Sequence, residues 1–351
     1  MLIVTPNPAV DHTVRLADLR PGEVMRARSG VSVAGGKGGN VARAARLLGA
    51  DPTVLAFVPD IGSEHLRALY AAEGFRLVGI PVPGRVRTCT ALIADSGEVT
   101  LVNEPGAVVA SADWARLMSA VDQHLRGHTA ARDGAPDGGA TGPGGATGPG
   151  IVLCSGSLPP GAPEDGYADI VRVGRAAGCE VLVDASGAPL ARAIEAGADL
   201  VCPNVSEAEG ILRAEPGDAG PAAERAHPGG RELVDDGGAD VPDRARSSAA
   251  ALLGRGARWA VVTAGSAGAA LAGPGVSMWF PAPRVAVRNP IGAGDSFLAG
   301  VATARAAGRD WPDAVRRGLA AGSASVEQDA AGVVDPSRVD QLEALLAAAV
   351  R

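Results

Sequence analysis

The hydrophobic positions of the chain fall into two alternating patterns. Short apolar runs such as LIVTPN (2–7) and TVLAFVP (53–59) are typical of buried β-strands. Between such runs apolar residues recur every three to four positions, as in GGNVARAARLLGA (38–50), where Gly49 can end a helix. Strands and amphipathic helices that alternate in this way predict an α/β fold with a mostly parallel sheet covered by helices on both faces.

The same alternation continues along the rest of the chain. Expected strands are 151–156, 180–186, 198–204 and 259–265, and expected helices are 63–74, 163–178, 292–308, 313–328 and 341–350. Each strand and its following helix form one unit of a doubly covered sheet.

Two segments do not fit that sheet. Residues 12–34 and 83–104 alternate polar and apolar side chains, as half-exposed strands do, and Asp95-Ser96-Gly97 predicts a hairpin turn in the second segment. They predict a small accessory sheet that forms a lid.

Two further segments have the composition of inserted surface loops. Residues 127–150 and 213–247 are rich in Gly, Ala and Pro and offer little to bury, which predicts flexible loops. Both connect strand–helix units, so neither marks a domain boundary. We expect residues 1–351 to form a single domain.

The composition and charge of the chain exclude several classes of function. Of the 351 residues 46% are hydrophobic and only 3% aromatic, so aliphatic residues must build the core. The net charge of −7 and the lack of a long basic run argue against an extended nucleic-acid surface. The four scattered cysteines form no C-x-x-C pair, and neither a signal peptide nor a membrane-spanning run is evident. We therefore expect a cytoplasmic protein without a membrane or nucleic-acid partner.

Candidate chemistry lies in two glycine-rich loops that precede helices. The chain lacks the Walker A spacing, and no G-x-G-x-x-G follows its first strand. The loops AGGKGGNVARAARLLG (34–49) and NPIGAGDSFLAG (289–300) instead place free amides at helix N-termini, where the helix dipole favours an anion. Two such loops on one α/β scaffold predict two ligands that meet in one crevice at the strand ends.

Asp295, in the second loop, allows two interpretations. An Asp at this point can cap the helix, and Asn caps about as well. Alternatively the amides of Gly292, Ala293 and Gly294 surround a transferred phosphoryl group while Asp295 takes the proton of the attacking hydroxyl. The residue pattern alone leaves both interpretations open.

These loops resemble the two signature motifs of the PfkB (ribokinase-like) carbohydrate kinases. Further matching stretches are TPNPAVD (5–11), PGEVMR (21–26), GRVRTCTALI (84–93), CSGSLPPG (154–161), CPNVSEAE (202–209) and VVTAGSAGAAL (261–271). They follow in order along nearly the whole chain. The resemblance implies a ribokinase-like fold with a β-sheet lid, and phosphorylation of a sugar that depends on ATP and Mg²⁺. It also implies that Asp295 is the general base.

For the sugar, the resemblance implies five binding residues. They are Asp11, Gly36, Lys37, Asn40 and Arg87. Asp11 would hold hydroxyls, and Lys37 with Arg87 would clamp an existing phosphate, for which a cation in an amide-lined loop is suited. The alternative interpretation of Arg87 is a solvated charge on a strand.

For the nucleotide, the resemblance implies a second group of residues. Asn204 and Glu207 would order Mg²⁺ and phosphates, Glu207 through water, as suits an ion that dehydrates reluctantly. Thr263, Gly265 and Gly268 would line ATP. By themselves these last three are also compatible with an ordinary turn.

The chain departs from the family pattern at two places. Cys202 stands where these sugar-phosphate kinases commonly have Lys, and Asn289-Pro290 is more like the kinases of tagatose 6-phosphate. Fructose 1-phosphate, converted to fructose 1,6-bisphosphate, is the expected substrate, with tagatose 6-phosphate and fructose 6-phosphate as alternatives. A non-catalytic sugar-phosphate sensor is a further alternative. By analogy with the family, we also expect a homodimer formed through the lid. Arg26 or Arg28 could reach a phosphate either within one chain or across that dimer.

Overall fold

The fold places nine strands in one sheet. The computed structural model describes residues 1–133, 150–214 and 240–349. The sheet order is β13-β12-β11-β10-β9-β8-β1-β4-β5, with every pair from β5 through β11 parallel. These strands are β1 (Leu2–Val4), β4 (Thr53–Ile61), β5 (Arg76–Arg85), β8 (Ile151–Ser155), β9 (Glu180–Asp184), β10 (Leu200–Val201), β11 (Ala260–Thr263), β12 (Gly268–Gly273) and β13 (Val276–Pro281).

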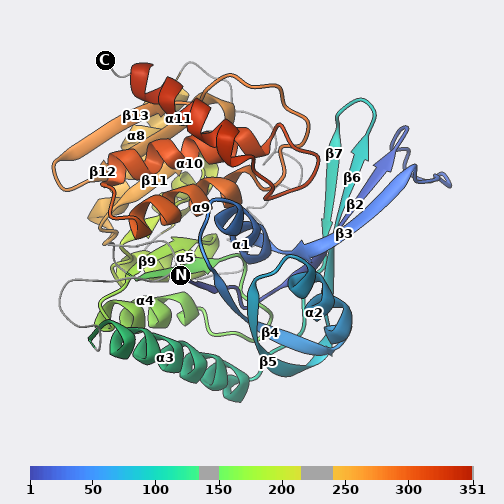
Figure 1. Cartoon of the computed structure of the whole chain (residues 1–351), viewed down its shortest axis with the longest axis horizontal. Coiled ribbons are helices and arrows are strands. Elements are labelled where there is room, and N and C mark those ends of the chain that lie inside the picture. Colours follow the sequence, from blue (N-terminus) through green and yellow to red (C-terminus); the bar gives the residue numbers. More distant parts are fainter. Residues whose placement is uncertain (134–149, 215–239, 350–351) are drawn as a thin grey trace.

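Helices cover both faces of this sheet, as the sequence pattern predicts (Figure 1). One face carries α1 (Lys37–Leu47), α2 (Ser63–Ala72), α9 (Ala293–Ala306), α10 (Trp311–Ser325) and α11 (Pro336–Ala349). The other carries α3 (Ser111–Asp133), α4 (Gly166–Ala176), α5 (Gly187–Glu195), α6 (Val205–Arg213) and α8 (Val241–Gly254). No helix of the described ranges is long and apolar enough to cross a membrane.

A second, four-stranded sheet confirms the predicted accessory sheet. It consists of β2 (Ala9–Leu16), β3 (Ser29–Gly35), β6 (Arg87–Ala94) and β7 (Val99–Asn103) in the order β3-β2-β6-β7. The predicted turn at Asp95-Ser96-Gly97 joins β6 to β7. Figure 1 shows these strands standing away from the helix-covered body. We call this sheet the lid.

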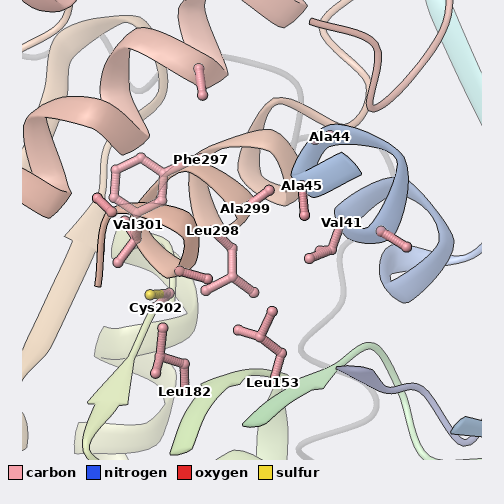
Figure 2. Packing of buried hydrophobic residues seen from close by; sticks show 14 of the residues in the cluster. Val41, Ala44, Ala45, Leu153, Leu182, Cys202, Phe297, Leu298, Ala299 and Val301 are labelled. Carbon is pink, nitrogen blue, oxygen red and sulfur yellow. The ribbon is translucent and has the colours of Figure 1, made fainter. Parts of the chain in front are cut away.

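The core holds α9 against the sheet. Figure 2 shows Leu298 of α9 beside Leu153 of β8 and Leu182 of β9, and all three side chains are fully buried. Truncating such a leucine to alanine typically costs ~2–5 kcal/mol, because the neighbours only partly fill the space. Phe297 on the same helix is also buried. The N-terminal turn of α9 therefore sits on a tightly packed base.

Several sequence expectations need correction. The hairpin formed by β12 and β13 is antiparallel and was not expected from the sequence, because its run of Ala and Gly has low strand propensity. Residues 127–133 extend α3 and residues 241–247 begin α8, so the ends of the expected surface loops are helical. The remaining parts of 127–150 and 213–247 lie almost entirely outside the described residues. The helix expected over 63–74 does begin at Ser63, with Gly62 as its N-cap, but it ends at Ala72.

Candidate active site

A cavity of about 1390 Å³ opens between the carboxyl ends of the parallel strands and the lid. Gly156, Asp184, Cys202 and Thr263, which end or directly follow β8, β9, β10 and β11, line it from the body. Side chains of β2, β3, β6 and β7 line it from the lid. This is where open α/β sheets bind ligands, and the volume exceeds that of a typical site for one small molecule.

Most of the residues expected from the sequence meet in this cavity. Twelve line it: Asp11, Gly36, Lys37, Asn40, Arg87, Asn204, Glu207, Thr263, Gly292, Ala293, Gly294 and Asp295. Gly265 and Gly268 do not. A Cβ on Gly268 would lie 2.1 Å from the carbonyl oxygen of Phe280, so close strand pairing accounts for this glycine.

The second glycine-rich loop opens α9 without a side-chain cap. Gly292 is the N-cap in the left-handed conformation (φ 79°), and within the described residues no side chain caps the helix. A Cβ at Gly292 would also lie 2.9 Å from the amide nitrogen of Gly332. The first amides of a helix lack intrahelical acceptors, so those of Ala293 and Gly294 are available to an anion in the cavity.

Asp295 is the third residue of α9 and not its cap, so the capping interpretation is wrong. Its carboxylate is buried, and its Oδ2 accepts a hydrogen bond of 2.9 Å from Nδ2 of Asn40. Burial raises the pKa of Asp295 to about 7, with Asp184 and Asp11 raising it further and Lys37 and Asn40 opposing the rise. A carboxylate poised near neutral pH is suited to accept a proton.

The first glycine-rich loop opens α1 in the same way. Gly36 is the N-cap at φ 74°, and its amide donates to Oδ1 of Asp11 at 3.0 Å. Asp11 lies on β2 beside Cys89 of β6. Burial raises the pKa of Asp11, and hydrogen bonds from Gly36 and Asn40 work against that rise. One carboxylate thus joins the base of the lid to the start of α1.

Lys37 forms an ion pair that was not expected from the sequence. Its Nζ donates to Oδ1 of Asp184 at 3.1 Å, and the Asp184 side chain is 9% exposed. Burial works against the charge of Lys37, but Asp184, Glu207 and Asp295 outweigh it and hold the Lys37 pKa above its usual value. The lysine therefore stays charged among three carboxylates. Its expected contact with a sugar phosphate stays a prediction.

Arg87 is not a solvated strand charge. Its Nη2 donates to the carbonyl of Asn7 at 2.7 Å and its Nη1 to the carbonyl of Glu104 at 3.2 Å. Main-chain carbonyls thus hold the guanidinium at the cavity wall. A role as phosphate ligand remains a prediction.

Asn204 and Glu207 form a capping box at the start of α6. The amide of Glu207 donates to Oδ1 of Asn204 at 2.8 Å, and the amide of Asn204 donates to Oε2 of Glu207 at 3.0 Å. This reciprocal pair fixes both side chains where they line the cavity. Cys202, two residues earlier, is buried, and its pKa is raised first by burial and then by Asp184, with Lys37 opposing.

Sequence reasoning missed two polar residues near the site. Asp184 ends β9, and its position directly after the run EVLV at a carboxyl strand end could have identified it. Arg43 donates to Oδ1 of Asn40 at 2.8 Å from within α1. No local signal marks Arg43, because the partners that bury it, Glu73 and Ala331, are distant in the sequence.

Comparison with known proteins agrees with this geometry. The chain matches the sequence profile of the pfkB family carbohydrate kinase over residues 4–127 and 149–338. It is 32% identical over 306 residues to 1-phosphofructokinase of Xanthomonas campestris pv. campestris, covering 86% of this chain and 83% of that protein. It is also 32% identical over 352 residues to 1-phosphofructokinase of Haloferax volcanii, covering 99% and 95%.

A solved structure with the same fold is that of Escherichia coli phosphofructokinase-2 in complex with potassium. The TM-score is 0.79 at 24% identity, with 99% of each chain covered. With the family profile, the curated relatives and the cavity in agreement, the chain belongs to the pfkB family of carbohydrate kinases and is a sugar kinase, a membership that implies use of ATP.

Proposed function

We propose that this chain phosphorylates fructose 1-phosphate to fructose 1,6-bisphosphate, with Mg²⁺-bound ATP as donor. Two curated relatives that are each 32% identical to it are named 1-phosphofructokinase, which supports the choice of substrate. The cavity volume of about 1390 Å³ suits two ligands that must meet.

Asp295 would act as the general base. Its buried carboxylate lines the cavity and has a pKa of about 7, so it can take the proton of the attacking sugar hydroxyl near neutral pH. Asn40 donates to Oδ2, which leaves Oδ1 for the substrate. Asp11 would hold other hydroxyls from the lid side.

The transferred phosphoryl group would lie at the start of α9. The amides of residues 292–294 and the helix dipole favour negative charge there. Lys37 adds a positive charge from the neighbouring α1, held by its ion pair with Asp184, and this charge also lowers the pKa of Cys202. We infer that Lys37 supplies a cation on the side where Cys202 replaces the lysine common in the family.

Mg²⁺ fits the residues of this site if it arrives with the nucleotide. Across the ranges that the structure describes, no group of three or more His, Cys, Asp or Glu residues could hold a metal ion. Mg²⁺ needs only one or two carboxylates when phosphates and waters complete its shell. Asp184 and Glu207 line the cavity and can supply them, Glu207 through water. Bound there, Mg²⁺ would neutralise phosphate charge.

Thr263 lines the part of the cavity that we assign to ATP. Gly265 and Gly268 lie in the turn that follows it and would act only by shaping that turn. The proposal for the nucleotide side therefore rests mainly on Asn204, Glu207 and Thr263.

Asn289 bears on the choice of sugar. It is 1% exposed, its Oδ1 accepts from the amide of Ile291 at 3.0 Å, and its Nδ2 donates to the carbonyl of Asp329 at 3.2 Å. Asn289 does not line the cavity. Pro290, the other residue of the pair that resembles kinases of tagatose 6-phosphate, does line the cavity, so tagatose 6-phosphate stays an alternative substrate.

The buried Asp295 at the start of α9 carries this proposal. The test is ADP release with Mg²⁺ and ATP and, separately, fructose 1-phosphate, tagatose 6-phosphate, fructose 6-phosphate or fructose, with Asp295→Asn alongside. We expect turnover of fructose 1-phosphate and a folded variant at least 10²-fold slower. Preference for another sugar phosphate would reassign the substrate. Binding without turnover would indicate a sensor.

A homodimer through the lid is a further part of the proposal. Val31 of β3 and Leu101 of β7 are 57% and 42% exposed on the face of the lid that lines the cavity, and Val102 of β7 is 55% exposed on the opposite face. The lid itself stands away from the body (Figure 1). A second copy of the lid would cover such apolar residues. Sedimentation of the protein and of Val102→Asp tests this, and a monomeric parent would contradict it.

A further inference from the structure

Arg43 of α1 is a buried arginine with all five donor hydrogens used. Its Nε and Nη2 bind Oε2 and Oε1 of Glu73 at 2.7 and 2.8 Å, and Nη2 also donates to the carbonyl of Ala34 at 2.5 Å. Its Nη1 donates to the carbonyl of Ala331 at 2.7 Å and to Oδ1 of Asn40 at 2.8 Å. The residue is 8% exposed. With every donor satisfied, the guanidinium has one defined position.

This position dictates how the amide of Asn40 is oriented. Arginine has no acceptor, so Asn40 must turn its oxygen toward Arg43. The Nδ2 group then faces the opposite way, where it donates to Oδ2 of Asp295 at 2.9 Å and favours the charged form of Asp11 by lowering its pKa. With the amide reversed, Oδ1 would face two carboxylates and Nδ2 would face a cation. Such an arrangement loses good contacts on both sides at once.

We propose that Arg43 is a positioning residue that fixes the amide of Asn40 so that Asn40 donates to the general base Asp295. The inference rests on the proposed function, since it requires Asp295 to be the base. Arg43 itself does not line the cavity, so it touches no substrate and acts only through Asn40.

The arrangement has a measurable consequence for the proton affinity of Asp295. The groups that face Asp295 are Lys37 and Asn40 of α1, Asp184 of β9 and Asp11 of β2. Asn40 stabilises the charged carboxylate and thereby lowers its pKa. Losing that hydrogen bond raises the pKa, so the activity that needs the ionised base moves to higher pH.

The experiment measures ADP release against pH for the parent and for Arg43→Met. We expect the midpoint of the acid limb to move up by about one pH unit, in line with a lost hydrogen bond to a charged group. The same midpoint in both proteins would overturn the proposal. If Arg43→Met does not fold, Arg43→Lys carries the test, because a lysine lacks the planar fork with which the guanidinium reaches Glu73 and Asn40 from separate nitrogens.

Glu73→Gln is the matched control. It weakens the anchoring of Arg43 to the end of α2 but keeps the donor to Asn40, so we expect lower thermal stability and an unchanged acid limb. A shift in this control as large as that of Arg43→Met would indicate general loosening and contradict the proposal.

A double variant separates positioning from direct charge. In an Asn40→Ala background, Arg43→Met should produce no additional shift of the acid limb. An additional shift would mean that the charge of Arg43 acts by itself, and would overturn the inference. Asp295→Asn distinguishes failure of the two proposals. If this variant retains activity, Asp295 is not the base. If it is inactive but the acid limb of Arg43→Met is unchanged, only the positioning role of Arg43 is contradicted.

Discussion

Lys37 and Asp184 form an ion pair inside the cavity, with 3.1 Å between Nζ and Oδ1. The lysine side chain is 42% exposed, whereas that of Asp184 is 9% exposed, so the buried carboxylate at the end of β9 holds the more exposed ammonium in place. The pair sets the local charge around Asp295, because Lys37 lowers the pKa of Asp295 and Asp184 raises it.

Variants of this pair should shift the pH profile in opposite directions. Lys37→Met removes the cation, so we expect the acid limb of ADP release to move to higher pH. It should also slow turnover by about 10²–10³-fold if the ammonium stabilises the transferred group. Asp184→Asn removes a negative charge and should move the same limb to lower pH. Shifts of the same sign in the two variants would contradict this account.

Asp295 should make the protein less stable as the pH rises. Burial raises its pKa to about 7, above the usual value near 4 in an unfolded chain. The folded state therefore binds the proton more tightly, and the stability from the neutral form is full below pH 4 and lost as the pH rises through 7. Above pH 7 we expect Asp295→Asn to be more stable by roughly 2–4 kcal/mol, an advantage that vanishes below pH 4. Urea denaturation of both proteins above pH 7 and below pH 4 measures this difference in the free energy of unfolding. The same difference at the two pH values would contradict the prediction.

Gly292 and Gly294 offer a paired test of the anion-binding loop. Gly292→Ala forces a side chain into a left-handed residue and against Gly332, so both stability and ADP release should fall. A Cβ at Gly294 meets no atom within 4 Å, and alanine favours the helix by up to about 1 kcal/mol. Gly294→Ala should therefore melt no lower than the parent and still lose activity, because its methyl group enters the phosphoryl space. Full activity in Gly294→Ala would mean that the transferred phosphoryl group does not lie at the start of α9.

Cys89 should report occupation of the cavity from the lid side. Burial raises its pKa to about 11, so little thiolate exists at pH 8 and iodoacetamide should react slowly. Cys89 lines the cavity next to Asp11, and a bound sugar phosphate should slow the reaction further. Peptide mass spectrometry follows the label, with the urea-unfolded protein as the fast control. If added sugar phosphate does not change the labelling rate of Cys89, the assignment of the sugar site to the lid side of the cavity is contradicted.

Sequence reasoning located the cavity because its signals are local. A glycine run before an apolar helix marks both Lys37 and Asp295, and the strand periodicity places the loops at one edge of the sheet. The local pattern did not decide whether Asp295 is a general base or a helix cap. The structure decides against the cap, because Gly292 takes that position and the carboxylate bonds to Asn40.

Residues whose role depends on distant partners could not be identified from the sequence. Arg43 falls in the run VARAAR and has the pattern of a charged helix surface, whereas it is buried against Glu73, 30 positions later. Likewise, Ala269 and Ala270 have little strand propensity, yet β12 forms because neighbouring strands pair with it on both sides. Tertiary contacts override local preference at both places.

The hydrogen bond between Asn40 and Asp295 joins residues 255 positions apart. Contacts of such sequence separation are slow to form, because closing the long intervening loop costs conformational entropy before the contact stabilises the fold. During synthesis α9 emerges after all nine strands of the described sheet, so the contact between Asn40 and Asp295 forms only late in chain growth. Recovery of ADP release after dilution from urea should accordingly coincide with the slowest structural phase, which makes catalysis itself a reporter of complete folding.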